Sequence, residues 1–597
     1  MTTKINKRQL IGASFIICTL SFGAALLGSC ADFLEIKPQS EIILEDFWNE
    51  KADVENVAIG CYSALQRDAV MQRMIIWGEA RSENVQSGQN INNNLDLYNV
   101  LRENITAKNR FTTWDGFYDV INRCNTVLKY APGVAEADPG FTQGDLNAII
   151  AEMTALRSLC YFYLIRTFRD VPYSTVAFTD DDQEMDLPAT PFEDVLDSLI
   201  NDLERVKKDA VVRYPESSQG VTPRYQTGRI TRDAIYAMLC EMYLWKKDYD
   251  NCIRYAELVI QSKKDMYEEE KSLGGRASLR SNDAIMEKRL NGYPLVNDAL
   301  SGNIFGSAYE AIFAQGVSRE TILELGFNEN PSQSDYLANS AISSLFGNAD
   351  NQKGLLQASE VLKDDIQKES GRAIFEDNNK KLDARLYFNC NYDNGNILKH
   401  AVSSVEIDAG GTSPKLNRQS YYANGNNSSK WIIYRLPDIM LLEAEALCQQ
   451  MQEGNEQSVL DFNAPKLDKC FQLVNAINKR SICKATLTDA DTLKRGDYTT
   501  KNLMEQLVMR ERQRELMFEG KRWYDLVRYC MRAGNTNPIV NVVSKRDDVN
   551  ASFAQNFFKK MDAIFWPYNM EEMKVNKNLI PNPVFGSGES TSYEKTK

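Results

Sequence analysis

Histidine is nearly absent from this sequence, whose 597 residues include one, His400. A single imidazole cannot build a metal site of several histidines, and a Ser-His-Asp triad would depend on that one ring. Because His400 follows Lys399 in a loop-like stretch, we expect an exposed side chain without a catalytic role. The sequence therefore predicts no metal site and no cofactor, and it contains no motif that marks an enzyme.

Long hydrophobic runs are also absent beyond Leu27, so no later segment is expected to cross a membrane. A hydrophobic fraction of 43% with 25% charged residues is typical of a globular chain. The net charge is −13, and this excess of acid disfavours nucleic acid and anionic lipid surfaces as main partners.

Cysteine is present but forms no C-x-x-C pair that would indicate zinc or a redox motif. Of the twelve cysteines, ten are scattered singly between Cys30 and the C-terminus. Cys160, Cys240 and Cys448 occupy apolar positions of expected helices, where cysteine behaves as a small buried hydrophobe. The sequence does not decide whether these ten are free or paired.

The N-terminus has the pattern of a secretory signal: Lys4, Lys7 and Arg8 precede the uncharged apolar residues 10–27. The ending Leu27-Gly28-Ser29-Cys30 resembles the bacterial lipobox. We therefore expect a signal peptide over residues 1–29, lipidation of Cys30, and a lipidated tether over residues 30–41. The alternative is an uncleaved transmembrane helix, because eighteen apolar-leaning residues could almost span a bilayer.

Helical periodicity dominates the rest. Apolar residues recur every three or four positions over residues 149–166, which predicts one buried helix face. Residues 231–262 indicate two antiparallel helices, with Thr231 as N-cap and a turn at Lys247 and Asp248. This pairing resembles a tetratricopeptide hairpin, and residues 436–450 with 467–480 predict a second one. The expected fold is mostly α, with stacked hairpins forming a scaffold.

Residues 271–430 have a different composition, rich in Gly, Asn, Ser and Asp, with short apolar runs between them. This density of turn-forming residues predicts a large irregular insert with few short strands, in which Asp393-Asn394-Gly395-Asn396 is better explained as a turn than as a calcium loop. We expect residues 42–597 to form a single domain that carries this insert.

Several sequence blocks, in order along the chain, together resemble the SusD/RagB family of outer-membrane nutrient-binding lipoproteins. The most specific is residues 510–528, with Arg510-Glu511-Arg512 and Arg522-Trp523. Glu511 and Arg514 lie three residues apart, so we interpret this block as a buried ionic network that fixes the scaffold. The other blocks are residues 30–34 with Pro38, Phe47 and Trp48; residues 114–125; residues 152–172; residues 228–245; and residues 435–446.

The resemblance implies a cell-surface lipoprotein, not an enzyme, that captures an oligosaccharide and delivers it to a SusC-like TonB-dependent porin in the outer membrane. Binding of sugars would use exposed aromatic rings flanked by amide side chains. We select Trp77, which precedes the Asn-rich residues 89–94, together with Tyr309 and Tyr336 in the insert. The glycan itself cannot be named, because specificity would lie in loops that share no motif.

Three alternatives stay open. Some members of the family resemble peptide-uptake components of the RagB type, and an acidic groove would suit basic peptides. A glycoside hydrolase would need two carboxylates roughly 5 to 9 Å apart, and no motif pairs any two here. A repeat scaffold without a ligand is the third. The chain also departs from the family pattern at residues 77–84 and 581–585, which argues against transferring ligand contacts directly.

Overall fold

In this computed structural model, placement is described for residues 47–180, 182–214, 225–274, 284–298, 302–327, 339–349, 352–362, 382–411, 414–422, 427–454 and 456–585. The signal peptide, Cys30, the tether over residues 30–41 and Tyr336 therefore lie outside the described residues.

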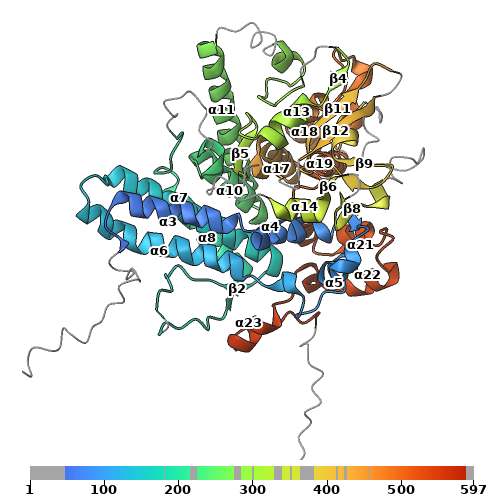
Figure 1. Ribbon diagram of the computed structural model, residues 1–597. Coiled ribbons are helices and arrows are strands. Elements are labelled where there is room, and N and C mark those ends of the chain that lie inside the picture. The colour runs from blue at the N-terminus through green and yellow to red at the C-terminus, as the bar shows by residue number, and fades with distance from the viewer. Residues whose placement is uncertain are drawn as a thin grey trace, which may run out of the picture.

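The N-terminal part is a bundle of long helices that lie side by side (Figure 1). The longest, α7 (Gln143–Phe168), starts with a capping box in which Thr142 and Asp145 each accept from the other's backbone N–H. In the described part of the chain, α7 alone is long and apolar enough to cross a membrane, but 89% of its apolar window is buried in the protein, as in a core helix. The other helices here are α3 (Lys51–Leu65), α4 (Asp68–Ile75), α5 (Leu95–Leu101), α6 (Asp115–Ala137) and α8 (Phe192–Val206).

The two predicted hairpins are present. In the first, Thr231 accepts from the backbone N–H of Ala234 to cap α10 (Arg232–Trp245), and α11 (Tyr249–Gly274) packs against α10 after a turn in which Lys247 has a φ of 65°. In the second, α17 (Leu436–Gln449) packs on α18 (Gln457–Arg480), which begins ten residues before the predicted Leu467. The mostly α fold with a helical scaffold is confirmed.

Cysteines lie where the hairpin helices cross. The Sγ atoms of Cys240 and Cys252 are 3.8 Å apart, as are those of Cys448 and Cys470. All ten cysteines of the described part of the chain are free and buried. The cysteines predicted at apolar helix positions are thus small buried hydrophobes, as expected.

The C-terminal part adds α19 (Lys501–Leu516) and α20 (Arg522–Ala533). α19 packs on α17, and α20 packs on η1, a π-helix over Ile76–Ala80. Shorter helices follow at the lower end of the molecule in Figure 1. These and the other short helices are α9 (Tyr225–Gly228), α13 (Ser307–Tyr309), α14 (Ser340–Phe346), α16 (Arg385–Phe388), α21 (Asn537–Val543), α22 (Ala551–Phe557) and α23 (Met570–Val575), with single turns η2 (Ile91–Asn93), η3 (Arg110–Thr112), η4 (Glu310–Gln315), η6 (Asp489–Asp491), η7 (Arg495–Asp497) and η8 (Met561–Ile564).

Strands are short and form separate antiparallel sheets, most of them within the predicted insert. The Asn394-Gly395 turn joins two of these strands, and Gly395 has a φ of 75°. The sheets pair β1 (Val85–Ser87) with β8 (Leu356–Ala358), β2 (Val171–Pro172) with β3 (Ala189–Thr190), β5 (Thr321–Leu325) with β13 (Trp431–Arg435), β6 (Gly347–Ala349) with β7 (Gln352–Lys353), β9 (Cys390–Asn391) with β10 (Asn396–Ile397), and β11 (Val402–Asp408) with both β12 (Lys415–Tyr421) and β4 (Ile304–Phe305).

His400 is not on the surface, which corrects the sequence-based expectation. Its side chain is fully buried, and its ring lies 5.0 Å from Phe313 and 5.3 Å from Trp431, measured between ring centroids. Burial lowers the pKa of His400 to about 3, so the imidazole is neutral. The polar neighbour Lys399 misled the prediction, because Lys399 is itself buried in an ion pair with Glu519 at 2.6 Å.

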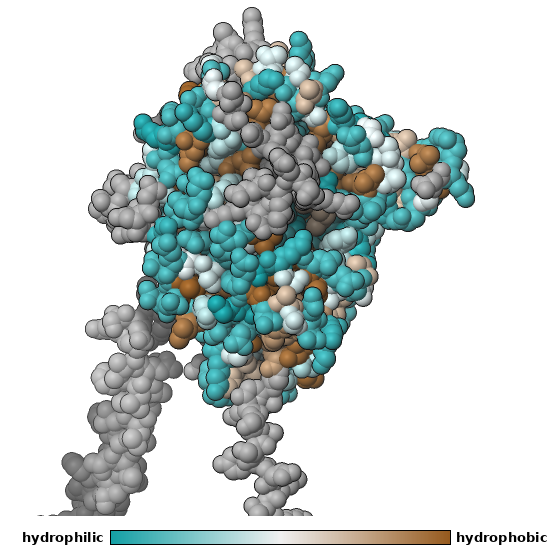
Figure 2. Space-filling view, turned by 90° about the vertical axis from the view of Figure 1, so that its right-hand side faces the viewer, coloured by the Kyte–Doolittle hydropathy of each residue, from teal (hydrophilic) through white to brown (hydrophobic). Residues whose placement is uncertain are grey.

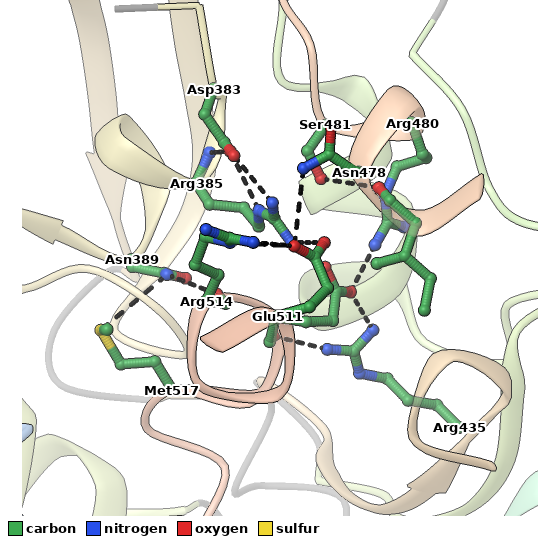
Figure 3. Close-up of polar contacts among 12 residues, drawn as sticks. Asp383, Arg385, Asn389, Arg435, Asn478, Arg480, Ser481, Glu511, Arg514 and Met517 are labelled. Atoms are coloured by element: carbon green, nitrogen blue, oxygen red, sulfur yellow. Dashed lines mark hydrogen bonds and ion pairs between the residues drawn. The ribbon is translucent and has the colours of Figure 1, made fainter. Parts of the chain in front are cut away.

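Charged side chains fill the junction between the insert and the scaffold. We call this cluster the ionic core. Figure 3 shows Arg385, Arg435 and Arg480 pointing toward carboxylates on α19. Arg385 lies 2.8 Å from Glu511 and 3.0 Å from Glu515. The ionic core comprises Asp383, Arg385, Lys399, Arg435, Arg480, Arg514, Glu320, Glu511, Glu515 and Glu519, all buried.

The ionic core explains the most specific sequence block. Arg514 pairs with Glu511 three residues earlier at 2.6 Å, as predicted, and Arg435 contacts Glu519 at 2.7 Å. Burial alone would raise the pKa of Glu519, but the charges of Arg435 and Lys399 hold it at about 2. Removing one partner of such a buried pair strongly destabilises the fold, because the other charge is left uncompensated. The prediction that residues 510–528 contribute to a buried ionic network is therefore confirmed.

Candidate functional site

An open groove lies where the Asn-rich loop after β1 meets α14 and the β6–β7 hairpin. We call it the amide groove. Its volume is about 490 Å³, within the range of small-ligand sites. Figure 2 shows the side of the molecule to which β8 and α5 belong, where hydrophilic residues predominate. The groove is lined by Asn90, Asn93, Asn94, Ser343, Ser344, Asn348, Lys353 and Leu355.

Backbone pairing holds the two sides of the groove together. β1 pairs with β8, and the ladder continues where Gly88 N–H donates to the carbonyl of Leu355 at 2.8 Å. The Asn90 amide then donates to the carbonyl of Lys353 at 3.1 Å across a separation of 263 residues. Leu355 N–H donates to the carbonyl of Ser344 at 3.1 Å, which ties α14 to the same ladder. The lining side chains therefore stand on a fixed backbone.

Two glycines permit this close approach. A Cβ on Gly88 would lie 2.3 Å from the carbonyl oxygen of Gly354, and a Cβ on Gly354 would lie 2.2 Å from the carbonyl oxygen of Leu345. Both distances are far inside van der Waals contact, so a side chain at either position would push the segments apart. Glycine allows such close backbone packing because it has no Cβ.

The lining side chains offer hydrogen bonds more than charge. Asn93 is exposed, and the Asn94 side-chain oxygen caps α5 by accepting from Leu97 N–H at 3.2 Å. The side-chain oxygen of Asn348 is buried and has no hydrogen-bond partner among the described residues. A buried acceptor without a donor is costly, and a ligand hydroxyl would satisfy it.

The groove differs in charge from the chain as a whole. No carboxylate is among the described residues that line it, although the chain has a net charge of −13. Lys353 supplies the one charge of this lining. Hydroxyl-rich neutral ligands, or ligands with a negative group, match this surface better than cationic ligands.

Trp77 does not line the groove. It is fully buried in η1, its indole N–H donates to the carbonyl of Phe111 at 2.8 Å, and its ring stacks on Phe117 with centroids 5.1 Å apart. Tyr309 is also buried, and its hydroxyl accepts from the backbone N–H of His400 at 3.1 Å. Neither ring has a face open to a sugar in this structure, so the sequence-based choice of these two is corrected.

The remaining sequence-based residues divide differently. Tyr336 lies outside the described residues, three positions before Asn339, which caps the groove helix α14. Three of the Asn-rich residues 89–94 line the groove, so this stretch stays a candidate region. Sequence reasoning missed Ser343, Ser344, Asn348, Lys353 and Leu355, because no motif distinguishes these residues from an ordinary polar loop.

The described lining holds no carboxylate, thiol or imidazole. Among the described residues no group of three or more His, Cys, Asp or Glu side chains could hold a metal ion. The described lining also lacks the carboxylate pair of a glycoside hydrolase. The arrangement can form many neutral hydrogen bonds to a ligand.

Comparison with known proteins covers most of the chain. Residues 304–585 match the model of the SusD family, and residues 32–244 match a model described as starch-binding associating with outer membrane. SusD-like protein P38 of Formosa agariphila is 24% identical, over 97% of this chain and 99% of its own length. SusD-like protein P25 of the same organism is 21% identical, over 94% and 96%.

Solved structures give the same fold. A SusD superfamily protein from Bacteroides thetaiotaomicron has a TM-score of 0.60 at 19% identity, covering 90% of this chain and 99% of its own. A structure titled as a laminarin binding SusD-like protein has a TM-score of 0.55 at 16% identity, covering 90% and 100%. At such identities these likenesses establish the fold alone.

Proposed function

Because this chain belongs to the SusD/RagB family, whose members are outer-membrane-associated binding proteins, we propose that it captures an oligosaccharide in the amide groove and delivers it to a SusC-like TonB-dependent porin. The observation that carries the proposal is the lining itself: four asparagines and two serines on a fixed backbone, one of them with a buried acceptor that has no described partner.

Sugar hydroxyls both donate and accept, and so do amide and hydroxyl side chains. A groove of about 490 Å³ lined by such groups can bond a hydroxyl-rich ligand at several points without burying a charge. One solved relative is described as laminarin binding, which supports a glycan as the ligand class.

Binding without cleavage is part of the proposal. A hydrolase would place two carboxylates around the scissile bond, and the described lining offers none. Basic peptides, the alternative ligand, would also gain from carboxylates. Lys353 leaves room for acidic sugars or for peptide carboxylates, so both belong in the ligand panel.

The proposed placement at the cell surface rests on the N-terminal sequence. Lipidation of Cys30 after removal of residues 1–29 would anchor the chain in the outer membrane, facing outward. Mass spectrometry of the protein purified from membranes tests this proposal, because a diacylated or triacylated N-terminal Cys30 peptide is expected. A first residue other than Cys30 would contradict it.

The ligand proposal is tested by calorimetry of the mature chain with β-glucan, starch and acidic oligosaccharides and with basic and acidic peptides. For whichever oligosaccharide binds, Asn93→Ala should lower the affinity about 3- to 10-fold, because a neutral hydrogen bond contributes about 0.5–1.5 kcal/mol. The matched control is Asn92→Ala, an exposed residue of the same loop that does not line the groove. Equal losses in both variants, or binding of peptides alone, would overturn the assignment.

A further inference from the structure

A second concave surface lies at the lower end of the molecule in Figure 1, between α6, the segment after β2, and α23. We call it the α6–α23 pocket. Its volume is about 510 Å³, and its lining shares no residue with the amide groove. Trp114, Tyr118 and Tyr161 contribute aromatic rings to it, and their mutual edge contacts fix their positions.

The pocket walls are pinned by hydrogen bonds. The side chain of Asn122 both donates to the carbonyl of Phe178 at 2.9 Å and accepts from its N–H at 2.8 Å. Asn125 donates to the carbonyl of Val176 at 3.0 Å, and Asn576 donates to that of Leu187 at 2.7 Å. These amides are therefore engaged in holding the walls open, and they have little capacity left to bind sugar hydroxyls.

Large aliphatic side chains are exposed around this pocket. Met185 and Val575 line it with exposed fractions of 55% and 75%. Val176, at 55%, belongs to the pinned wall, and Ile580, at 83%, follows the lining residue Leu579. Clustered exposed apolar residues mark surfaces that bind other molecules.

The charge of the pocket has one sign. Asp115, Asp119, Asp186 and Glu572 line it, and no lysine or arginine is among its lining residues. Asp119 is paired with Arg67 at 2.8 Å and with Arg123 at 2.9 Å, but the nearest cation of Asp115 is Arg73 at 3.7 Å. Burial raises the pKa of Glu572, and the charge of Asp115 adds to this rise. A docked cation would therefore be favoured at this rim.

We propose that the α6–α23 pocket docks a polypeptide segment of a partner protein that carries basic residues beside apolar ones. Aliphatic rim residues pack against leucine-like side chains, while the carboxylates pair with lysine or arginine. A glycan fits less well, because it would leave the aliphatic rim without apolar contacts. This proposal does not depend on a ligand in the amide groove.

The test uses three fluorescein-labelled nonapeptides and the mature full chain in fluorescence anisotropy. The peptides alternate leucine with arginine, leucine with glutamate, and serine with arginine. We expect the leucine–arginine peptide to bind at least tenfold more tightly than the other two, with affinity that falls as salt is raised. Equal binding of both arginine peptides would overturn the proposal in favour of unspecific charge attraction.

Variants locate the binding site. Val575→Ser combined with Ile580→Ser should weaken the leucine–arginine peptide about tenfold, and Asp186→Asn should reduce its dependence on salt. Leu503→Ser, an equally conservative change at an exposed leucine on α19, is the matched control. A loss of similar size in the control would overturn the proposal, with circular dichroism confirming that all variants fold.

Sedimentation and calorimetry separate the remaining explanations. The chain is expected to stay monomeric in sedimentation velocity. A dimer that dissociates when Val575→Ser and Ile580→Ser are introduced would show instead that the pocket binds a second copy of this chain, and would overturn the proposal. Oligosaccharide binding should be unchanged in these variants. Failure of peptide binding with intact glycan binding therefore rejects this inference and leaves the proposed function standing.

Discussion

The ionic core and the amide groove are both polar, but they differ in whether their polar groups have partners within the chain. In the ionic core, ten charged side chains are buried and each contacts an opposite charge within the protein. In the amide groove, the polar side chains are mostly neutral, and Asn348 keeps a buried acceptor without a described partner. The first region has its interactions complete within the chain, so it fixes structure. The second has hydrogen-bonding capacity left, so it can bind something else.

The largest test of this contrast is removal of one cation from the ionic core. Arg385→Met leaves Asp383, Glu511 and Glu515 short of a buried positive charge. We expect a loss of about 3–5 kcal/mol in the free energy of unfolding, because an uncompensated buried charge is strongly destabilising. Urea denaturation at pH 7 measures it.

The matched control is Arg67→Met, which removes an arginine that is 54% exposed and pairs with Asp119 at the surface. Its expected cost is about 0–1 kcal/mol. If Arg385→Met cost no more than Arg67→Met, the ionic core would not be the element that fixes the insert on the scaffold.

Acid should lower the stability that the ionic core contributes. The pKa of Glu519 is held at about 2, below its ordinary 4.5, so the folded state binds fewer protons than the unfolded state between these values. This stability is fully present above pH 4.5 and is lost as the pH falls toward 2, about 3 kcal/mol in all. Unfolding midpoints measured from pH 5 to pH 2.5 should fall steadily.

The groove should not follow that profile. Its described lining has no carboxylate or imidazole, so the oligosaccharide affinity of the folded protein is expected to change less than about twofold between pH 5 and pH 3.5, where the Glu519 contribution to stability is being lost. A strong pH dependence of affinity in this range would place a titrating carboxylate in contact with the ligand and would break the contrast.

A smaller effect is expected from the glycine that brings the groove walls together. Gly88→Ala should cost about 1–3 kcal/mol and abolish measurable oligosaccharide binding, because the new Cβ would meet the carbonyl oxygen of Gly354 at 2.3 Å. Gly60→Ala is the control: Gly60 lies within α3 with open space around it, and alanine should stabilise that helix by about 0.5–1 kcal/mol. Thermal melts and calorimetry together distinguish the two.

Local patterns in the sequence predicted the scaffold well. The Thr231 cap, the turn at Lys247 and the helix around Cys160 each follow from residues close together in the chain. The block around Glu511 and Arg514 also carried its own signal, because helical spacing places those charges side by side. Caps, turns and helical charge spacing depend on residues close together in the chain, so they can be predicted from the sequence.

Burial set by distant residues could not be predicted in the same way. Trp77 and His400 are each followed or preceded by polar residues, yet contacts with Phe117 and Trp431 place both rings in the core. The groove depends on a pairing between Asn90 and Lys353, 263 residues apart. No pattern within either segment indicates that the other will face it.

The smallest predicted effect separates the two regions most clearly. Asn348→Ala removes a buried acceptor that has no described partner, so the unliganded protein should be unchanged or about 0.5–1 kcal/mol more stable. Oligosaccharide binding should weaken about 3- to 10-fold, because the ligand hydroxyl that would satisfy that acceptor loses its partner. Stability and affinity then move in opposite directions, whereas Arg385→Met lowers stability. Differential scanning fluorimetry with calorimetry on the same samples measures both quantities. A parallel loss of both would mean that Asn348 serves the fold, and the unsatisfied acceptor would no longer mark the binding site.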